Sequence, residues 1–266
     1  MTSLSSLTIG HGPHKLVFLH GLFGQGKNFG TAAKFLADHA TSVLMDLPNH
    51  GRSEWTDRFD YQLFADIVAQ ELVNLGADSA PVTLIGHSMG GKVAMQLALS
   101  HPQLIEGLVV IDMSPVDRED PAEFEYYADT LAELDLSAIR SRADADAALR
   151  PAIPQHSIRS FLLQNLHRGT GPQGWRWLLN LDLLRTSMRQ MSDWPDQGGR
   201  HWDGPVLWLA GEHSGFITDE HVPAMRALFP SVQLEVIGDA SHWVHADQPR
   251  AVADALLRFL SSLNRE

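Results

Sequence analysis

Short apolar runs alternate with longer helical patterns along most of this 266-residue chain. Runs rich in Val, Leu and Ile, bounded by turn residues, are typical of buried strands. They lie at residues 15–21, 42–46, 81–86, 107–112, 205–211 and 232–238. Helical patterns lie near residues 29–39, 60–75, 89–101, 218–229 and 248–263. This alternation predicts an α/β fold with a mostly parallel central sheet and helices on both faces.

The alternation is interrupted once, because more than ninety residues separate Asp112 from the strand that begins at Pro205. This is far longer than an ordinary crossover. The segment has a helical character: one helix is expected to start at Asp120-Pro121, a second covers 157–168, and residues 174–188 are strongly apolar. An insertion at the carboxyl end of a strand lies above the crevice where α/β sheets bind ligands. We therefore expect a helical cap inserted after Asp112, with the following division: core 1–115 and 201–266, cap 116–200.

The stretch LIGHSMGGKVAM, residues 84–95, runs from a predicted strand into a predicted helix. Ser88 stands between Gly86 and Gly90, and Gly91 follows. Glycine at such a joint costs conformational entropy, so its presence needs a steric reason. Gly-x-Ser-x-Gly is the nucleophile-elbow pattern, which holds a serine hydroxyl above the end of a sheet. The pentapeptide alone is also compatible with a Gly-rich turn at a helix start.

A serine hydroxyl becomes a good nucleophile when a histidine, oriented by a carboxylate, accepts its proton. In this order of elements the histidine follows the last strand. The segment VIGDASHWVHADQP, residues 236–249, offers His242 and, three residues later, His245. We favour His242 as the base. A metal site at the two histidines is disfavoured because no third ligand of clear spacing accompanies them.

Acyl transfer also needs hydrogen-bond donors placed where the oxyanion develops. One candidate is the backbone N–H of Met89, the residue after the nucleophile. The other lies in the loop after the first predicted strand, FLHGLFGQGKNFG, where Gly21 allows close approach of the backbone. We expect the Leu22 N–H to be the second donor, in preference to that of Phe23.

Two further motifs compete with this interpretation. GLFGQGKN, residues 21–28, nearly matches the phosphate-binding Gly-x-x-x-x-Gly-Lys-Ser/Thr, but Asn28 replaces the hydroxyl that binds Mg²⁺. The same reading leaves Ser88 and His242 unexplained. A Ser-x-x-Lys motif would need lysine at position 91, which is glycine. We therefore expect Lys92 to lie on a helix surface.

The composition of the chain limits the classes of partner and site that we expect. A net charge of −12 disfavours a nucleic-acid partner, which needs a basic face. The chain has no cysteine, which excludes disulfides, thiolate nucleophiles and Cys-ligated zinc. The first residues lack the features of a signal peptide, and no apolar run approaches the ~20 residues of a membrane span. We expect a cytoplasmic protein that acts on a small molecule.

The motifs FLHGLFG, DLPNHGRS, GHSMGGKVAM, VVIDMSPV and SHWVHADQP occur in the order found in the α/β-hydrolase superfamily. The chain most resembles the YbfF-type bacterial esterases and their mitochondrial abhydrolase relatives. The resemblance spans residues 15–116 and 205–260 and is weak in the cap. It implies a Ser-His-acid hydrolase of acyl esters or thioesters that needs no cofactor. Haloalkane dehalogenases and epoxide hydrolases of this fold carry aspartate at the elbow, so Ser88 disfavours them.

The chain departs from the superfamily at the triad acid. Many members keep it after the strand that corresponds to residues 205–211, where this chain has Ser214. The alternatives are Asp112, which the resemblance to YbfF-type enzymes favours, and Glu212. A turn or helix cap is the structural alternative for Asp112.

The function expected first is an esterase or thioesterase that uses Ser88, His242 and Asp112. A C–C bond hydrolase on the same scaffold is the second hypothesis, because residues 151–200 hold six arginines and no lysine. A solvated helix face is the simpler explanation of those arginines. A non-catalytic ligand-binding protein is the third hypothesis. Apolar cap residues, notably Phe124, Phe161 and Trp177, predict a preference for short to medium hydrocarbon acyl groups.

Overall fold

The computed structural model describes residues 2–117, 121–169 and 174–263, and its central feature is a seven-stranded sheet. The strand order is β1-β3-β2-β4-β5-β8-β9. Neighbouring strands run parallel except for β1, which pairs antiparallel with β3. The bounds are β1 Ser6–Ile9, β2 His14–Leu19, β3 Ala40–Met45, β4 Val82–His87, β5 Ile105–Ile111, β8 Val206–Gly211 and β9 Val232–Ile237. The predicted α/β fold with a mostly parallel sheet is confirmed.

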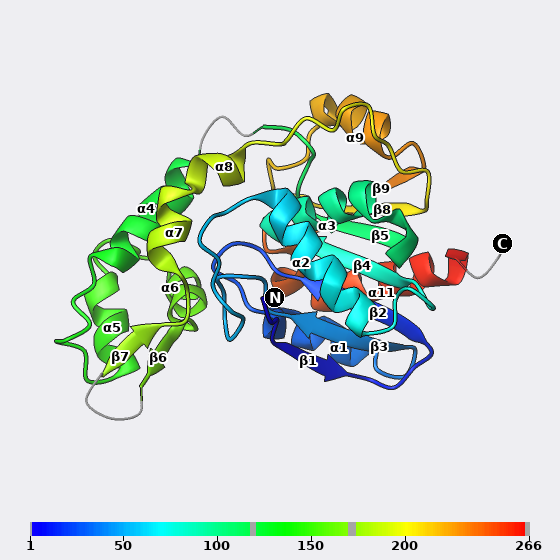
Figure 1. Cartoon of the computed structure of the whole chain (residues 1–266). Coiled ribbons are helices and arrows are strands. Elements are labelled where there is room, and N and C mark those ends of the chain that lie inside the picture. Colours follow the sequence, from blue (N-terminus) through cyan, green and yellow to red (C-terminus); the bar gives the residue numbers. More distant parts are fainter. Residues whose placement is uncertain (1, 118–120, 170–173, 264–266) are drawn as a thin grey trace.

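Helices cover both faces of this sheet (Figure 1). Apolar residues four apart, Phe64, Val68 and Leu72, give helix α2 (Tyr61–Asn74) one buried face. Two core clusters divide the helices by face, so α2, α3 and α9 cover one face, and α1 and α11 cover the other. The bounds are α1 Gly30–Phe35, α2 Tyr61–Asn74, α3 Met89–Ser100, α9 Val222–Leu228 and α11 Pro249–Leu263. Short turns of helix complete the core: η1 Gly26–Phe29, η2 Pro102–Leu104, η3 Asp219–His221 and α10 Val244–Asp247.

The segment between β5 and β8 forms the cap, on the left in Figure 1. Its elements are α4 Ala122–Ala132, α5 Arg142–Leu149, α6 His156–Leu163, β6 Leu166–Arg168, β7 Trp175–Trp177, α7 Leu181–Thr186 and α8 Met188–Ser192. Cap residues such as Leu131 and Leu184 belong to the same apolar cluster as the core residues Val110 and Leu84. The boundaries at 115/116 and 200/201 stay a prediction, and cap residues 118–120 and 170–173 lie outside the described residues.

The structure corrects the predicted cap helices. The helix expected over 157–168 ends at Leu163, and the apolar segment 174–188, which lies in the stretch expected to be helical, begins instead as strand β7. β6 and β7 form an antiparallel hairpin in which Leu166 pairs with Trp177. Aromatic residues fit a pleated, half-buried surface, so tertiary packing overrides the helical spacing read from the sequence. Among the described residues, no helix has the length and apolar character required to cross a membrane.

Candidate active site

Ser88 occupies the turn between β4 and α3 in a strained conformation, with φ of 53° and ψ of −122°. Its flanking glycines leave no room for side chains. A Cβ on Gly86 would lie 2.2 Å from the Gly90 carbonyl oxygen, and one on Gly90 would lie 2.4 Å from that of Leu19. The steric reason that the motif requires is therefore the contact of the turn with its own helix and with the end of β2.

Three side chains from distant parts of the chain meet at this turn. His242, in the loop between β9 and α10, lies with Nε2 3.0 Å from Ser88 Oγ. Its Nδ1 lies 2.7 Å from Asp112 Oδ2. Asp112 follows the carboxyl end of β5 and is fully buried, whereas His242 and Ser88 keep 9% and 7% of their surface exposed. The result is a continuous hydrogen-bonded chain from a buried carboxylate to a hydroxyl that solvent reaches.

Asp112 is held by more than the histidine. It has a φ of 50°, its Oδ1 accepts the Gly211 N–H at 3.0 Å, and its Oδ2 also accepts the Ser214 hydroxyl. Ser214 stands where many family members carry the acid, so this position still contacts the carboxylate. The role of Ser214 is not predictable from its residue type, and its place in the motif is the signal in the sequence that points to it. Glu212 turns elsewhere, because its half-exposed carboxylate accepts the Asp239 N–H at 2.9 Å.

The His242 ring is fixed on several sides. It stacks on Phe216, with ring centroids 3.6 Å apart and planes 14° from parallel. The His87 ring contacts it at a centroid distance of 4.8 Å, and His87 Nε2 hydrogen-bonds the His242 carbonyl oxygen at 2.8 Å. His245, the competing candidate, packs instead between Phe29 and His87. Burial, and then the neighbouring His242, lowers the pKa of His245 to about 3.

Two other buried histidines brace the loops beside the site. His20 Nε2 accepts the Leu47 N–H at 2.9 Å, so its Nδ1–H donates to the Gly21 carbonyl oxygen at 2.8 Å. His50 Nε2 accepts the Phe23 N–H at 3.3 Å. Burial lowers the pKa of His20 to about 4 and that of His50 to about 3. Both rings are therefore neutral loop supports at ordinary pH.

The two expected oxyanion donors lie beside Ser88. Leu22 and Met89 line the same cleft as Ser88. The Phe23 N–H already donates to His50, so the Leu22 N–H is the remaining candidate for the second oxyanion donor in the loop that follows Gly21. A Cβ on Gly21 would lie 3.0 Å from Ser88 Cβ, so this loop does approach the nucleophile closely. Whether these amides bind an oxyanion stays a prediction.

Ser88 opens onto apolar space. A cleft of about 50 Å³ is lined mainly by apolar side chains, and we call it the methionine cleft: Leu22, Tyr61, Met89, Met113, Phe124, Met188, Met191 and Phe216. A narrow gap bounded by Phe161 and Trp243 also reaches Ser88 and His242. These two rings also line a larger cleft of about 290 Å³, the Trp243 cleft. Of the expected cap residues, Phe124 and Phe161 line this space, whereas Trp177 lies on β7 and lines none of the three clefts.

The prediction that Lys92 lies on a helix surface is wrong, because Lys92 is fully buried. Its Nζ donates to the carbonyl oxygens of Ser192 at 2.6 Å and Asp193 at 2.9 Å, at the end of α8. The last carbonyls of a helix need such donors from outside the helix. Lys92 therefore connects the helix that follows the nucleophile to the end of the cap.

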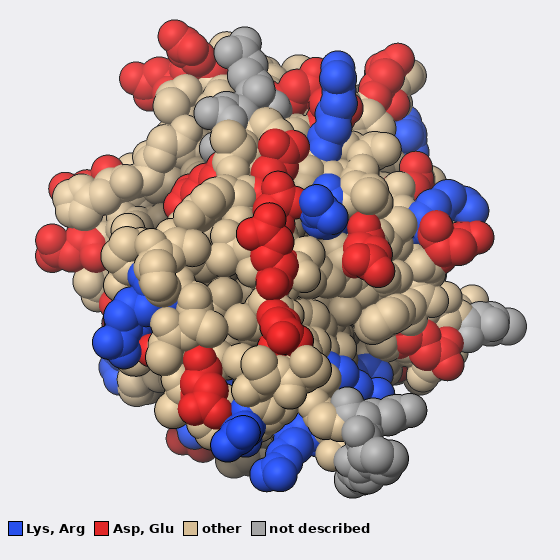
Figure 2. All heavy atoms as spheres, turned by 90° about the vertical axis from the view of Figure 1, so that its left-hand side faces the viewer, with Lys and Arg blue, Asp and Glu red and all other residues tan. Residues whose placement is uncertain are grey.

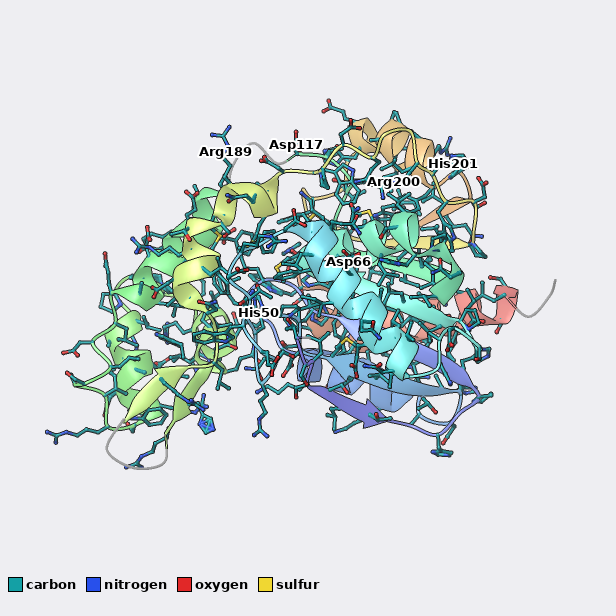
Figure 3. The ribbon with its side chains drawn as sticks, viewed as in Figure 1. His50, Asp66, Asp117, Arg189, Arg200 and His201 are labelled. Atoms are coloured by element: carbon teal, nitrogen blue, oxygen red, sulfur yellow. The ribbon has the colours of Figure 1, made fainter. Side chains whose placement is uncertain are left out.

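The six cap arginines do not line the clefts beside Ser88. Arg159 is buried and pairs with Asp146 at 2.7 Å, and Arg185 pairs with Asp129. Arg189 lies at the upper edge of the cap (Figure 3), and Arg200 Nε donates to the Gln197 carbonyl oxygen at 3.0 Å. The solvated-face explanation holds for some of them, but Arg159 is a structural ion pair.

One group of exposed side chains could approach a metal ion. Glu212, His213 and Asp239 each place a ligand atom within 4.8 Å of the others. All three are exposed, and the Glu212 carboxylate already accepts the Asp239 N–H. Exposed acidic groups are common without a metal, so this group carries no assignment.

Comparisons with known proteins place the chain among hydrolases of one family. The sequence matches the family described as alpha/beta hydrolase fold over residues 15–249. The sn-1-specific diacylglycerol lipase ABHD11 of Danio rerio is 36% identical, over 92% of this chain and 78% of its own length. Esterase YbfF of Escherichia coli is 32% identical, over 94% of each chain. A solved marine microorganism esterase superposes with a TM-score of 0.92 at 30% identity, covering 97% of this chain and all of its own.

Proposed function

The chain belongs to the α/β-hydrolase family, and on that premise we propose that it is a serine esterase or thioesterase acting on small acyl substrates. The observation that carries the proposal is the hydrogen-bonded chain Ser88–His242–Asp112. Its similarity to esterases and a lipase over most of its length supports the same class of reaction.

In the proposed mechanism, Ser88 Oγ attacks the acyl carbon while His242 Nε2 accepts its proton. The imidazolium that forms then gives this proton to the alcohol or thiol of the substrate. The alcohol or thiol departs, and the acyl group stays bound to Ser88 as an acyl-enzyme. In the second half of the reaction, His242 accepts a proton from a water molecule, which attacks the acyl-enzyme, and then returns the proton to Ser88 Oγ. Asp112 keeps the Nδ1–H tautomer and stabilises the imidazolium, and the N–H groups of Leu22 and Met89 receive the oxyanion.

The two clefts suggest how a substrate divides at Ser88. We assign the acyl group to the methionine cleft, because this cleft is apolar and its volume of about 50 Å³ suits a short acyl chain. The leaving group extends past Phe161 and Trp243 into the larger Trp243 cleft. The Trp243 cleft mixes apolar walls with Ser157, Ser241 and Asp247, which suits an alcohol or thiol larger than the acyl part.

The two alternative functions have less support. A C–C bond hydrolase acting on a carboxylated substrate would use cap arginines at the site, but Arg159 and Arg185 are paired with aspartates elsewhere. A non-catalytic binding protein has no need of a buried carboxylate aligned through His242 to a solvent-accessible serine.

The assignment of the nucleophile is tested with Ser88→Ala, which removes one oxygen from a defined turn. We expect hydrolysis of p-nitrophenyl acetate to fall at least ~10³-fold, because removing a triad member abolishes the covalent route. A fluorophosphonate probe should label the wild type and leave the variant unlabelled. Ser100→Ala is the control, since that hydroxyl only bonds the Gln96 carbonyl oxygen of its own helix. Full turnover in Ser88→Ala would contradict the proposal.

Acyl selectivity is tested with p-nitrophenyl esters graded from acetyl to decanoyl. We expect kcat/KM to fall by at least about tenfold at the long end, because the methionine cleft is small. Met188→Ala should shift the preference to longer chains by enlarging the cleft. Met95→Ala makes the same truncation at a buried position of α3 that does not line the cleft, and it should not shift the preference. If kcat/KM of the wild type did not change with acyl length, the assignment of the acyl group to this cleft would be wrong.

A further inference from the structure

A second cavity, of about 470 Å³, lies where the core meets the cap, and basic side chains converge on it. Lys27 comes from η1, Arg52 from the loop after β3, and Arg142 from the start of α5. We call this cavity the basic groove. Its other polar walls include Asp46, Gln164 and His167.

The protein balances the positive charge of the basic groove only in part, through Asp46. Within the described ranges of the chain, Lys27, Arg52 and Arg142 form no ion pair. Asp46 is the one carboxylate among the groove's lining residues, and both its oxygens are used by backbone groups. Its Oδ1 accepts the Gly26 N–H at 2.8 Å, and its Oδ2 accepts the Arg52 N–H at 3.0 Å. Three cations thus face one carboxylate, in a chain whose net charge is −12.

The cations are also held together against their mutual repulsion. Burial, followed by repulsion from Arg142, lowers the pKa of Lys27. Arg142 is fixed from the cap side, since its guanidinium donates to the carbonyl oxygens of Leu163 and Leu166. Neutral carbonyls orient a guanidinium without cancelling its charge. An anion bound between these side chains would relieve the repulsion.

We propose that the basic groove binds a small phosphate-bearing molecule, through the side chains of Lys27, Arg52 and Arg142. Arginine forks and a lysine ammonium match the several oxygens and multiple charges of phosphate groups. The groove's volume exceeds the needs of one phosphate and suits a diphosphate with an organic substituent. A long nucleic acid is disfavoured as the ligand, because acidic side chains run through the middle of the cap face and would repel its phosphate backbone (Figure 2).

This site differs from a phosphate-binding loop, although Lys27 belongs to the GLFGQGKN motif. In such a loop the backbone N–H groups cradle the phosphates. Here the Gly26 N–H is occupied by Asp46, and Asn28 bonds Gln25 and Gln164. Recognition would therefore come from the side chains of Lys27, Arg52 and Arg142. Gln164 also ties the groove to the site, because it lines the groove and bonds Asn28, which lines the gap beside His242.

The test is isothermal titration of the full-length protein with inorganic pyrophosphate at low salt. We expect binding to the wild type that weakens at least about tenfold in the double variant Lys27→Gln/Arg52→Gln. Arg226→Gln removes an exposed positive charge on α9 and should leave the affinity within about twofold. Far-UV circular dichroism and urea unfolding serve as the folding controls for all variants, because neither measurement depends on turnover.

Three results would overturn the proposal: no binding at about 1 mM pyrophosphate, equal affinity in the double variant, or equally tight binding of succinate. The binding measurement needs no turnover, so it stands even if Ser88 proves not to be a nucleophile. A kinetic arm that does rest on the proposed function then identifies the source of the phosphate. If the phosphate belongs to the substrate, the double variant should raise KM for an acetyl thioester of a diphosphate-bearing thiol, and not for p-nitrophenyl acetate. If KM is unchanged for both, the groove binds a separate ligand.

Discussion

Among single residues, Asp112 combines a positive φ with full burial and a carboxylate that has three hydrogen-bond partners. An uncompensated carboxylate in such a place would be costly, so its partners define its orientation. The sequence could narrow the acid to Asp112 or Glu212, because both follow a strand at the correct edge of the sheet. Local spacing does not decide between them, because the choice depends on which carboxylate faces His242 across neighbouring strands; the preference for Asp112 rests on the resemblance to YbfF-type enzymes.

Asp112→Asn should keep the packing almost unchanged and favour the wrong imidazole tautomer. We expect kcat to fall at least ~10²-fold, since loss of the tautomer costs about 10⁴ in a well-studied serine protease. Glu212→Gln should change kcat by less than about tenfold, a difference under ~1.4 kcal/mol. Both are measured with p-nitrophenyl acetate at saturating concentration. The reverse ranking would move the acid to Glu212.

At the scale of elements, α3 shows where prediction from sequence ends. Its position after the elbow was predictable from local spacing, but every residue from Met89 to Leu99 is buried. The sheet covers one side of α3, and α2 and the end of α8 cover others. That last contact joins residues about a hundred positions apart, and no local pattern in the chain reports it. The same limit explains the β6–β7 hairpin, whose pairing is tertiary.

Lys92→Met tests the connection between α3 and α8. It leaves the carbonyl oxygens of Ser192 and Asp193 without their lysine donor, and it removes support from Met188 and Met191 in the wall of the methionine cleft. We expect a loss of about 1–3 kcal/mol in the free energy of unfolding, and a KM for short esters raised more than kcat is lowered. Lys34→Met, on the exposed side of α1, is the matched control and should change neither. An unchanged KM in Lys92→Met would show that the contact between Lys92 and the end of α8 does not affect substrate binding.

For the whole molecule, the buried histidines link stability to pH. His20, His50 and His245 have pKa values of about 4, about 3 and about 3 in the folded protein, below the 6.5 of an unperturbed histidine. The unfolded chain therefore binds more protons than the folded one between about pH 3 and pH 6.5, so stability falls as the pH drops through this window.

The expected size of this effect is about 2 kcal/mol for each histidine between pH 7 and pH 5. It is measured as the free energy of unfolding in urea at both values. His245→Phe should reduce the slope, because a phenyl ring keeps the packing against Phe29 and His87 and cannot be protonated. His11→Phe, at an exposed position, should leave the slope unchanged. The same slope in His245→Phe and the wild type would show that His245 does not contribute.

The short antiparallel strand β1 has a consequence for how this protein behaves at high concentration. β1 occupies the outer side of β3, with Ser6 opposite Met45 and Ile9 opposite Ser42. It therefore uses hydrogen-bonding groups that an uncovered edge strand would offer to another molecule. A chain cut before Gly10 would present the backbone of β3 as a template for intermolecular pairing. The sheet instead ends at β1, an edge strand of only four residues, and so short an edge offers little backbone for pairing with another molecule.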